Sequence, residues 1–355
     1  STDVAIAGAF GGNFITGTTA AFLDDATSLS AKKLTIEADR DGWIVSLTAG
    51  VSGASGKKGI AVGGSVGITM TDYTTEAMLS NTTGGIDGAI ALGADGSTNI
   101  ILIAGSAGFG GKAGIGAAIA FTQISNDTLA TIDTVTNLKH AGDLSVTANS
   151  SSLIVAVTGS AGVGSGSNST LGLAGTVTVN RISNTVEAEI RNSSFDAAST
   201  GNISIRATDN SFIFSFAGAF GAASGGAGLG VAAAVNLLDN TLLAHVESST
   251  LRSTGTLDIE AEQTGTLVSV AVGVGAGKQF AGGGSITVND IDNTIEAIVD
   301  KGSDIQVGGA IDIHAQDTSV SVTVSGGVAF ATKGAAVGAA FAGNFISNTL
   351  TAKVD

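Results

Sequence analysis

The chain has 355 residues, of which 53 are glycine and none is cysteine or proline, and its formal net charge at pH 7 is −15. The absence of cysteine excludes disulfides and thiolate metal sites, and the acidic balance argues against nucleic acid as a partner, because phosphate binding needs clustered Lys and Arg. The hydrophobic content of 43% against 13% charged residues is the opposite of the composition of disordered chains.

A single passage recurs along the whole chain. Its most regular position is an alanine, found at intervals of 56, 53, 58, 56, 53 and 55 residues as Ala21, Ala77, Ala130, Ala188, Ala244, Ala297 and Ala352. A fixed period of this length predicts a repeat architecture, in which each unit stacks on the next. We therefore expect one elongated repeat domain over residues 1–355, with no internal boundary.

Each unit begins with a step that holds two asparagines and the anchor alanine. The asparagines are Asn180 and Asn184, Asn236 and Asn240, Asn289 and Asn293, and Asn344 and Asn348. Next to them, Val186, Ala188 and Ile190 alternate with Glu187 and Glu189, which predicts a strand with one buried and one wet face. A second alternating strand follows, for example at 257–261. The second unit is the most divergent and has Tyr73 where other units have asparagine.

The third part of each unit is a limb rich in glycine and alanine, as in 267–289 and 320–344. Both faces of its strands are apolar or tiny, so we expect these strands to be buried on both faces. A polar turn interrupts each limb, and five of the turn residues are lysines: Lys57, Lys58, Lys112, Lys278 and Lys333. A unit thus offers four strands and no helical periodicity.

These patterns predict an all-β fold, a β-solenoid similar to a parallel β-helix, with about six repeats of about 55 residues. Because one rung of such a helix usually takes about 18 to 30 residues, we favour two rungs per repeat and a rod about 60 Å long. The alternative is one wide rung per repeat and a rod of half that length. It would stack Asn180, Asn236, Asn289 and Asn344 into an amide ladder.

No catalytic, cofactor-binding or metal-binding site is expected from the spacing of the polar residues. His140, His245 and His314 fall at non-equivalent repeat positions, and we interpret them as surface residues. Fragments of calcium-loop sequence at 39–42 and 84–88 do not repeat in tandem, so we interpret them as ordinary turns that could hold only adventitious calcium.

The step Asn180-Arg-Ile-Ser-Asn184-Thr, its copies and the limb ahead of each resemble the repeats of large bacterial exoproteins. These are leukotoxin-like filamentous adhesins, related in style to filamentous haemagglutinin and autotransporter passengers. The resemblance covers essentially the whole chain. It implies an extracellular or cell-surface location and transfers no binding residues.

The resulting hypothesis is a non-catalytic structural or adhesive segment of an extracellular fibre or surface filament, and not an enzyme. Expected partners are the chain itself, neighbouring segments of a larger chain, or a host or cell-surface ligand, without nucleic acid and without a transmembrane segment. The turn lysines could contact the acidic face of a neighbouring rod. Three alternatives stay open: a β-helix polysaccharide-cleaving enzyme using paired carboxylates such as Glu187 and Glu189, a flat-faced ice- or surface-binding solenoid, and a membrane-active toxin fragment.

Overall fold

The computed structural model describes residues 3–300 and 302–355, except for the side chains of 196–199. Within these residues the chain forms strands and turns and no helix. The strands run in parallel and stack into sheets, which confirms the predicted all-β solenoid.

Each repeat forms one rung that contains a long strand, a short strand and a second long strand. The first four rungs are β1 (Val4–Asp24), β2 (Leu29–Ala31) and β3 (Leu34–Ala54); β4 (Ile60–Ser80), β5 (Gly84–Ile86) and β6 (Ile90–Gly110); β7 (Ala113–Asp133), β8 (Lys139–His140) and β9 (Leu144–Gly164); and β10 (Leu171–Arg191), β11 (Ser194–Ser199) and β12 (Ile203–Ala223).

In the later rungs some long strands are divided by a short interruption. The fifth rung is β13 (Ala227–Leu238), β14 (Thr241–Glu247), β15 (Thr250–Ser253) and β16 (Leu257–Gly277). The sixth is β17 (Phe280–Ile291), β18 (Thr294–Val299), β19 (Asp304–Val307), β20 (Ile311–Asp317) and β21 (Val320–Ala331), and it is followed by β22 (Ala335–Ile346) and β23 (Thr349–Val354).

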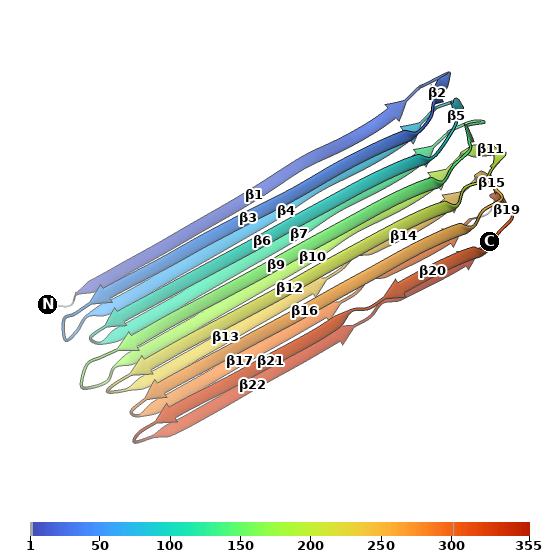
Figure 1. Ribbon diagram of the computed structural model, residues 1–355. Coiled ribbons are helices and arrows are strands. Elements are labelled where there is room, and N and C mark those ends of the chain that lie inside the picture. The colour runs from blue at the N-terminus through green and yellow to red at the C-terminus, as the bar shows by residue number, and fades with distance from the viewer. Residues whose placement is uncertain (1–2, 301) are drawn as a thin grey trace.

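Equivalent strands of successive rungs form two wide sheets. Sheet 1 has the order β1-β4-β7-β10-β13-β17-β22, with β14, β18 and β23 continuing its last strands, and sheet 2 has the order β3-β6-β9-β12-β16-β20, with β21 beside β16. The short strands form two further small sheets, β2-β5-β8 and β11-β15-β19, which the sequence patterns did not predict. Figure 1 shows the long strands side by side, with tight turns at one end and the short strands at the other.

The expectation of two rungs per repeat is wrong, because each repeat contributes one wide rung. The anchor alanines Ala21, Ala77 and Ala130 pair directly from strand to strand, as do their later equivalents. The limb and the anchor step join without a turn into strands of 21 residues, such as β10. At about 3.3 Å per residue such a strand is about 70 Å long, whereas seven stacked layers span only about 30 Å. The described chain is a slab whose longest dimension follows the strands.

The slab tapers from the short strands toward the tight turns. Its wide half encloses a core of Leu, Ile, Val and Ala side chains, which includes the fully buried Leu79, Ile132 and Phe195. The thin half, which we call the blade, comprises residues 4–13, 43–69, 99–122, 153–180, 212–236, 266–289 and 320–344. Inside the blade the two sheets approach so closely that a Cβ added to Gly116 would lie 2.3 Å from the carbonyl oxygen of Ala161.

The outward face of the blade is exposed, so the expectation that limb strands are buried on both faces is wrong. Ile6 is 77% exposed, Leu47 72% and Val231 54%. Each sheet covers only the inner face of the other, and no further layer of the described chain lies outside them.

We predict that adding one methyl group will distinguish the two faces of β10. A Cβ on Gly172 would lie 1.9 Å from the carbonyl oxygen of Ala222, whereas one on Gly175 meets nothing within 4 Å. Gly172→Ala should lower the free energy of unfolding by about 1–3 kcal/mol, because overpacking forces the sheets apart. Gly175→Ala should be neutral or stabilising by about 0.4–1 kcal/mol, because it restricts the unfolded chain. Denaturant unfolding measures both, and equal effects would contradict the close approach.

Candidate functional site

The first asparagine of each repeat points into the slab and forms a ladder along the stack. Asn180 Nδ2 donates to Asn236 Oδ1 at 2.9 Å, and Asn236 Nδ2 donates to Asn289 Oδ1 at 3.0 Å. All three side chains are fully buried. Asn13 and Asn344 occupy the same register position at the two ends of the stack. This is the amide ladder of the one-rung alternative.

The second asparagine binds the backbone of the preceding rung. The backbone N–H of Asn184 donates to Asn240 Oδ1 at 2.8 Å, that of Asn240 to Asn293 Oδ1 at 3.0 Å, and that of Asn293 to Asn348 Oδ1 at 2.9 Å. These bonds satisfy backbone donors where the strands are interrupted.

The divergent second unit replaces this asparagine with an aromatic residue. Tyr73 pairs in register with Asn126, and the guanidinium carbon of Arg40 lies 3.8 Å from the centre of the Tyr73 ring. Arg40 Nη2 also donates to the Thr98 hydroxyl at 2.7 Å. A cation–π contact therefore takes the place of the asparagine bond in this layer.

A carboxyl group lies at the centre of the polar interior. The Asp209 carboxyl accepts from Asn184 Nδ2 at 2.8 Å, from Asn240 Nδ2 at 2.8 Å, from Gln263 Nε2 at 3.0 Å and from the Ser211 hydroxyl at 2.5 Å. Its burial raises the pKa of Asp209, and these hydrogen bonds only partly oppose that effect. Composition and repeat period gave no sign of this group, although the interior register position of Asp209 could have indicated it.

His140 is buried, so its interpretation as a surface residue is wrong. Its ring lies edge-on to Phe195 with 5.6 Å between ring centres, and its Nδ1 is 2.8 Å from the carbonyl oxygen of Gly142. Burial lowers the pKa of His140. This packing closes the wide end of the slab.

His245 is partly buried on the outer face of sheet 1, between carboxylates of two neighbouring rungs. Its Nδ1 is 3.4 Å from Glu189 Oε1 and its Nε2 is 3.0 Å from Asp300 Oδ2. The hydrogen bond to Glu189, followed by that to Asp300, raises the pKa of His245. The third histidine, His314, is exposed.

The two calcium-like fragments lie in the wide half. Residues 39–42 belong to the continuous strand β3, so their interpretation as a turn is wrong, and residues 84–88 include the short strand β5. Among the described residues, no group of three or more His, Cys, Asp or Glu side chains could hold a metal ion.

The paired carboxylates lie on the outer faces of the two sheets, where neighbouring side chains leave Glu189 only 8% exposed. Glu187 and Glu189 are on the outer face of β10, and burial together with the neighbouring Glu189 raises the pKa of Glu187. On the other sheet, Glu260 of β16 is 2.5 Å from Arg206 Nη2. This ion pair neutralises part of the acidic outer face of sheet 2.

The five turn lysines all lie at the thin edge of the blade. Lys57, Lys58, Lys112 and Lys333 are exposed, and Lys278 is half-buried. None of the ion pairs between described residues involves a turn lysine. The structure thus gathers these lysines along one edge and leaves their predicted role in lateral contacts as a prediction.

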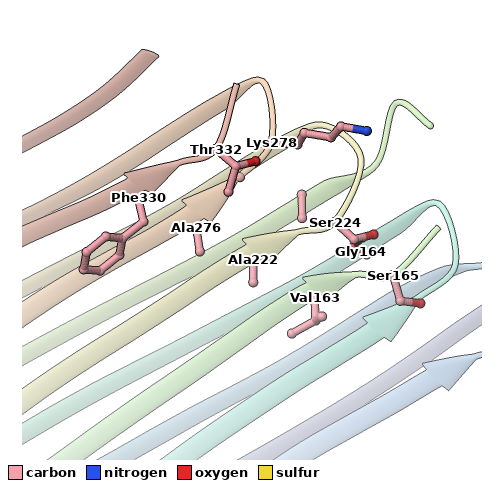
Figure 2. A pocket seen from close by; sticks show the side chains of 11 residues that line it. Val163, Gly164, Ser165, Ala222, Ser224, Ala276, Lys278, Phe330 and Thr332 are labelled. Atoms are coloured by element: carbon pink, nitrogen blue, oxygen red, sulfur yellow. Dashed lines mark hydrogen bonds between the residues drawn. The ribbon is translucent and has the colours of Figure 1, made fainter. Parts of the chain in front are cut away.

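Figure 2 shows a hollow on the outer face of sheet 2, beside the tight turns. It has a volume of 450 Å³, and its floor is formed by Ala222 and Ala276 on neighbouring rungs. Val163 and Phe330 stand at its sides because the same register column has larger side chains there. Lys278, with Ser165, Ser224 and Thr332, lines the hollow at the turn end. The hollow is apolar on its floor and polar at one end.

No described helix is long and apolar enough to cross a membrane. Comparison of the chain with protein-family models, with curated proteins and with solved structures gives no match.

We predict that the amide ladder tolerates threonine better than leucine. Asn236→Leu should lower the free energy of unfolding by about 1–3 kcal/mol for each buried partner that it leaves unpaired, Asn180 Nδ2 and Asn289 Oδ1. Asn236→Thr should cost less, because Thr69 and Thr122 already occupy this column. Denaturant unfolding of both variants tests this, and a leucine variant as stable as the wild type would show that the ladder is dispensable.

We predict that Asp209 makes the fold more stable at acidic pH. Because its folded-state pKa lies above the unfolded one, the stability that it contributes is fully present below the unfolded pKa and is lost as pH rises through the folded pKa. Asp209→Asn should therefore raise the melting temperature at pH 8, and this gain should shrink toward pH 4. The new amide can donate to Asn184 Oδ1, which has no partner.

Thermal unfolding across pH measures the difference between Asp209→Asn and the wild type. Asp312→Asn, on the exposed outer face of β20, is the matched control, and its melting temperature should equal that of the wild type at every pH. If the gain in melting temperature of Asp209→Asn were the same at every pH, the ionisation of buried Asp209 would not be its cause.

Proposed function

We propose that this chain is a non-catalytic structural segment of a bacterial extracellular fibre or surface filament, which assembles by stacking its parallel β-rungs. The observation that carries the proposal is the likeness of the two end strands of sheet 1. Phe10-Gly-Gly-Asn-Phe-Ile15 in β1 and Phe341-Ala-Gly-Asn-Phe-Ile346 in β22 differ at one of six positions. They occupy the same register columns, six rungs apart.

Both of these strands are edge strands of the described stack. β1 pairs only with β4, and β22 pairs only with β17. Open parallel edges this long are templates for pairing with another strand. A β1 strand of a second copy, or an equivalent strand of a neighbouring segment, would find in β22 a partner with matching columns.

The direction of the amide ladder suits such a junction. Asn180 and Asn236 each donate their Nδ2 to the asparagine of the next rung, and Asn13 Nδ2 donates in the same direction to the Thr69 hydroxyl at 3.3 Å. Asn289 Nδ2 instead donates across the slab to the Ser321 hydroxyl at 3.1 Å. Asn344 Nδ2 donates to the Thr323 hydroxyl at 3.1 Å, and a stacked copy would bring Asn13 Oδ1 beside this amide as a further acceptor. A heterologous contact of this kind generates an open filament when the rotation does not close.

Sheet 2 has one layer fewer than sheet 1, so a stacked copy would leave one layer open there. Arg40 and Asp317 occupy the same column on the two sides of that open layer. A strand from a neighbouring segment would complete it. An adhesive role toward a host or cell-surface ligand stays a prediction of the sequence resemblance.

The proposal is tested by placing a charge in the end layer. Ile346 is an inward-facing, 54% exposed residue of the last rung and would be covered by Ile15 of a stacked copy. Ile346→Lys should abolish stacking, because it would bury an unpaired ammonium group. Thr351→Lys, on the outer face of the same layer, is the matched control and should leave stacking intact.

Electron microscopy and fibre diffraction of the three proteins give the readout. Wild type and Thr351→Lys should form filaments with a repeat of about 4.8 Å along their axis, and Ile346→Lys should stay as single slabs. Wild-type protein that remains monomeric at high concentration would overturn the proposal.

A further inference from the structure

The blade has its polarity reversed relative to a water-soluble sandwich. Toward the tight turns its inner face is built mostly from Gly, Ala, Ser and Thr, and Thr176, Ser215 and Ser269 are buried without hydrogen-bond partners. Among the described blade residues, large buried side chains occur only where the blade joins the wide half, as Ile44, Ile100, Leu102, Ile154, Ile213 and Leu267. Its outer face carries the large side chains, with Phe10 70% and Val45 70% exposed. Exposed apolar surface of this extent, continuous over several strands, marks an interaction site.

The reversal holds on both sides of the slab. On sheet 1 one outward column contains Phe10, Val66, Ile119, Val177, Ala233, Ile286 and Phe341. On sheet 2 an outward column contains Leu47, Ile103, Val157, Phe216, Val270 and Val324. A second slab packed on one face would leave the opposite face in water. Lipid hydrocarbon covers both faces at once.

The apolar band also has the depth of a bilayer. Every sheet 1 strand is free of charge over the ten residues next to the tight turns, as in 171–180, and every sheet 2 strand over twelve, as in 212–223. At about 3.3 Å per residue this band is about 33–40 Å deep. The hydrocarbon core of a bilayer is about 30 Å thick.

Polar groups border the band at both ends. The charged residues at the tight-turn edge of the blade are the five turn lysines and Asp3, which lies beside Gly56, and their net positive charge suits anionic headgroups. At the other border Trp43, the single tryptophan, is 62% exposed and is followed toward the wide half by Asp41 and Asp39. Phe14 and Phe345 stand at the same depth on sheet 1 and are 67% and 55% exposed. Tryptophan favours the membrane–water interface.

We propose that the blade inserts into a lipid bilayer, with the tight turns at one surface and the acidic wide half outside the other. Within lipid every backbone donor and acceptor must be paired. The inner strands β4 to β17 meet this condition on both edges. The open edges are those of β1 and β3 at one end of the stack and of β21 and β22 at the other. The inference rests on the proposed stacking to pair β1 with β22, and on the strand of a neighbouring segment that completes sheet 2 to pair β3 and β21.

Protection of lysines from an amine reagent that cannot cross membranes tests the topology. The purified chain is added to preformed vesicles of phosphatidylcholine and phosphatidylglycerol, labelled from outside and analysed by mass spectrometry. Lys32, Lys33, Lys139 and Lys353 of the wide half should be labelled. The five turn lysines should react only after detergent opens the vesicles. Labelling of both sets in intact vesicles would overturn insertion, because it indicates adsorption or packing of slabs against each other.

A pair of variants on the outer face of β10 tests the band. Val177→Asp places a carboxylate in mid-band and should reduce the fraction that floats with vesicles by about tenfold or more. Thr185→Asp, on the same face in the wide half, should float like the wild type. Equal flotation of both variants would overturn the proposal.

The same preparations separate this inference from the stacking proposal. Filaments that form in water but do not float would overturn insertion and leave stacking intact. Flotation with turn-lysine protection, without stacks in micrographs, would overturn the stacking proposal and support insertion.

Discussion

The structure depends on the residue-for-residue register between equivalent strands of successive repeats. A slip by one residue would exchange the inner and outer sets of every strand. It would place Ile6, for example, in an inner column that holds only glycine and alanine. The spacing of the repeats varies, but the complete long strands keep a length of 21 residues. The turns at both ends absorb the variation, for example 111–112 against 165–170.

Because of this register, each repeat position forms a column of equivalent residues along the stack. The side chains in these columns differ between the two halves of the slab. In the wide half the inner columns are Ile, Leu and Ala, which form an apolar core. Next to the tight turns the inner columns are so small that the sheets nearly touch, and there the large apolar side chains of the repeat lie outside. The asparagine columns lie between the blade and the wide half, where the sheets separate. There the side-chain oxygens of the second asparagines accept hydrogen bonds from backbone N–H groups.

The sequence predicted the repeat, the alternating strands, the anchor alanines and the divergence at Tyr73. It could not choose between one and two rungs, because alternation reports which residues share a face and not whether two strands join end to end, as at Asn180. The prediction that the limb strands are buried on both faces failed because Gly and Ala fit either a buried or an exposed face. The Val and Phe side chains of the limb suit a protein interior and a lipid environment equally well, so the sequence did not show that they point outward. Asp209 and His140 were missed because their burial depends on columns contributed by other rungs.

Register also explains why the repeats agree at apolar and asparagine positions but differ at charged ones. Identical rungs would place like charges directly opposite each other in every column, which is destabilising in paired strands. At several places unlike charges meet: Arg191 is 3.2 Å from Asp133 of the preceding rung, and Arg252 is 2.7 Å from Asp304 of the following one. Like charges remain opposite each other at Asp39 and Asp95 and at Asp258 and Asp312. Among the described residues the wide half holds 9 Lys and Arg against 29 Asp and Glu, because five lysines lie in the blade and Asp3 lies beside its tight turns. Because cations are few, divergence between neighbouring rungs lowers the number of like charges that face each other in the acidic half.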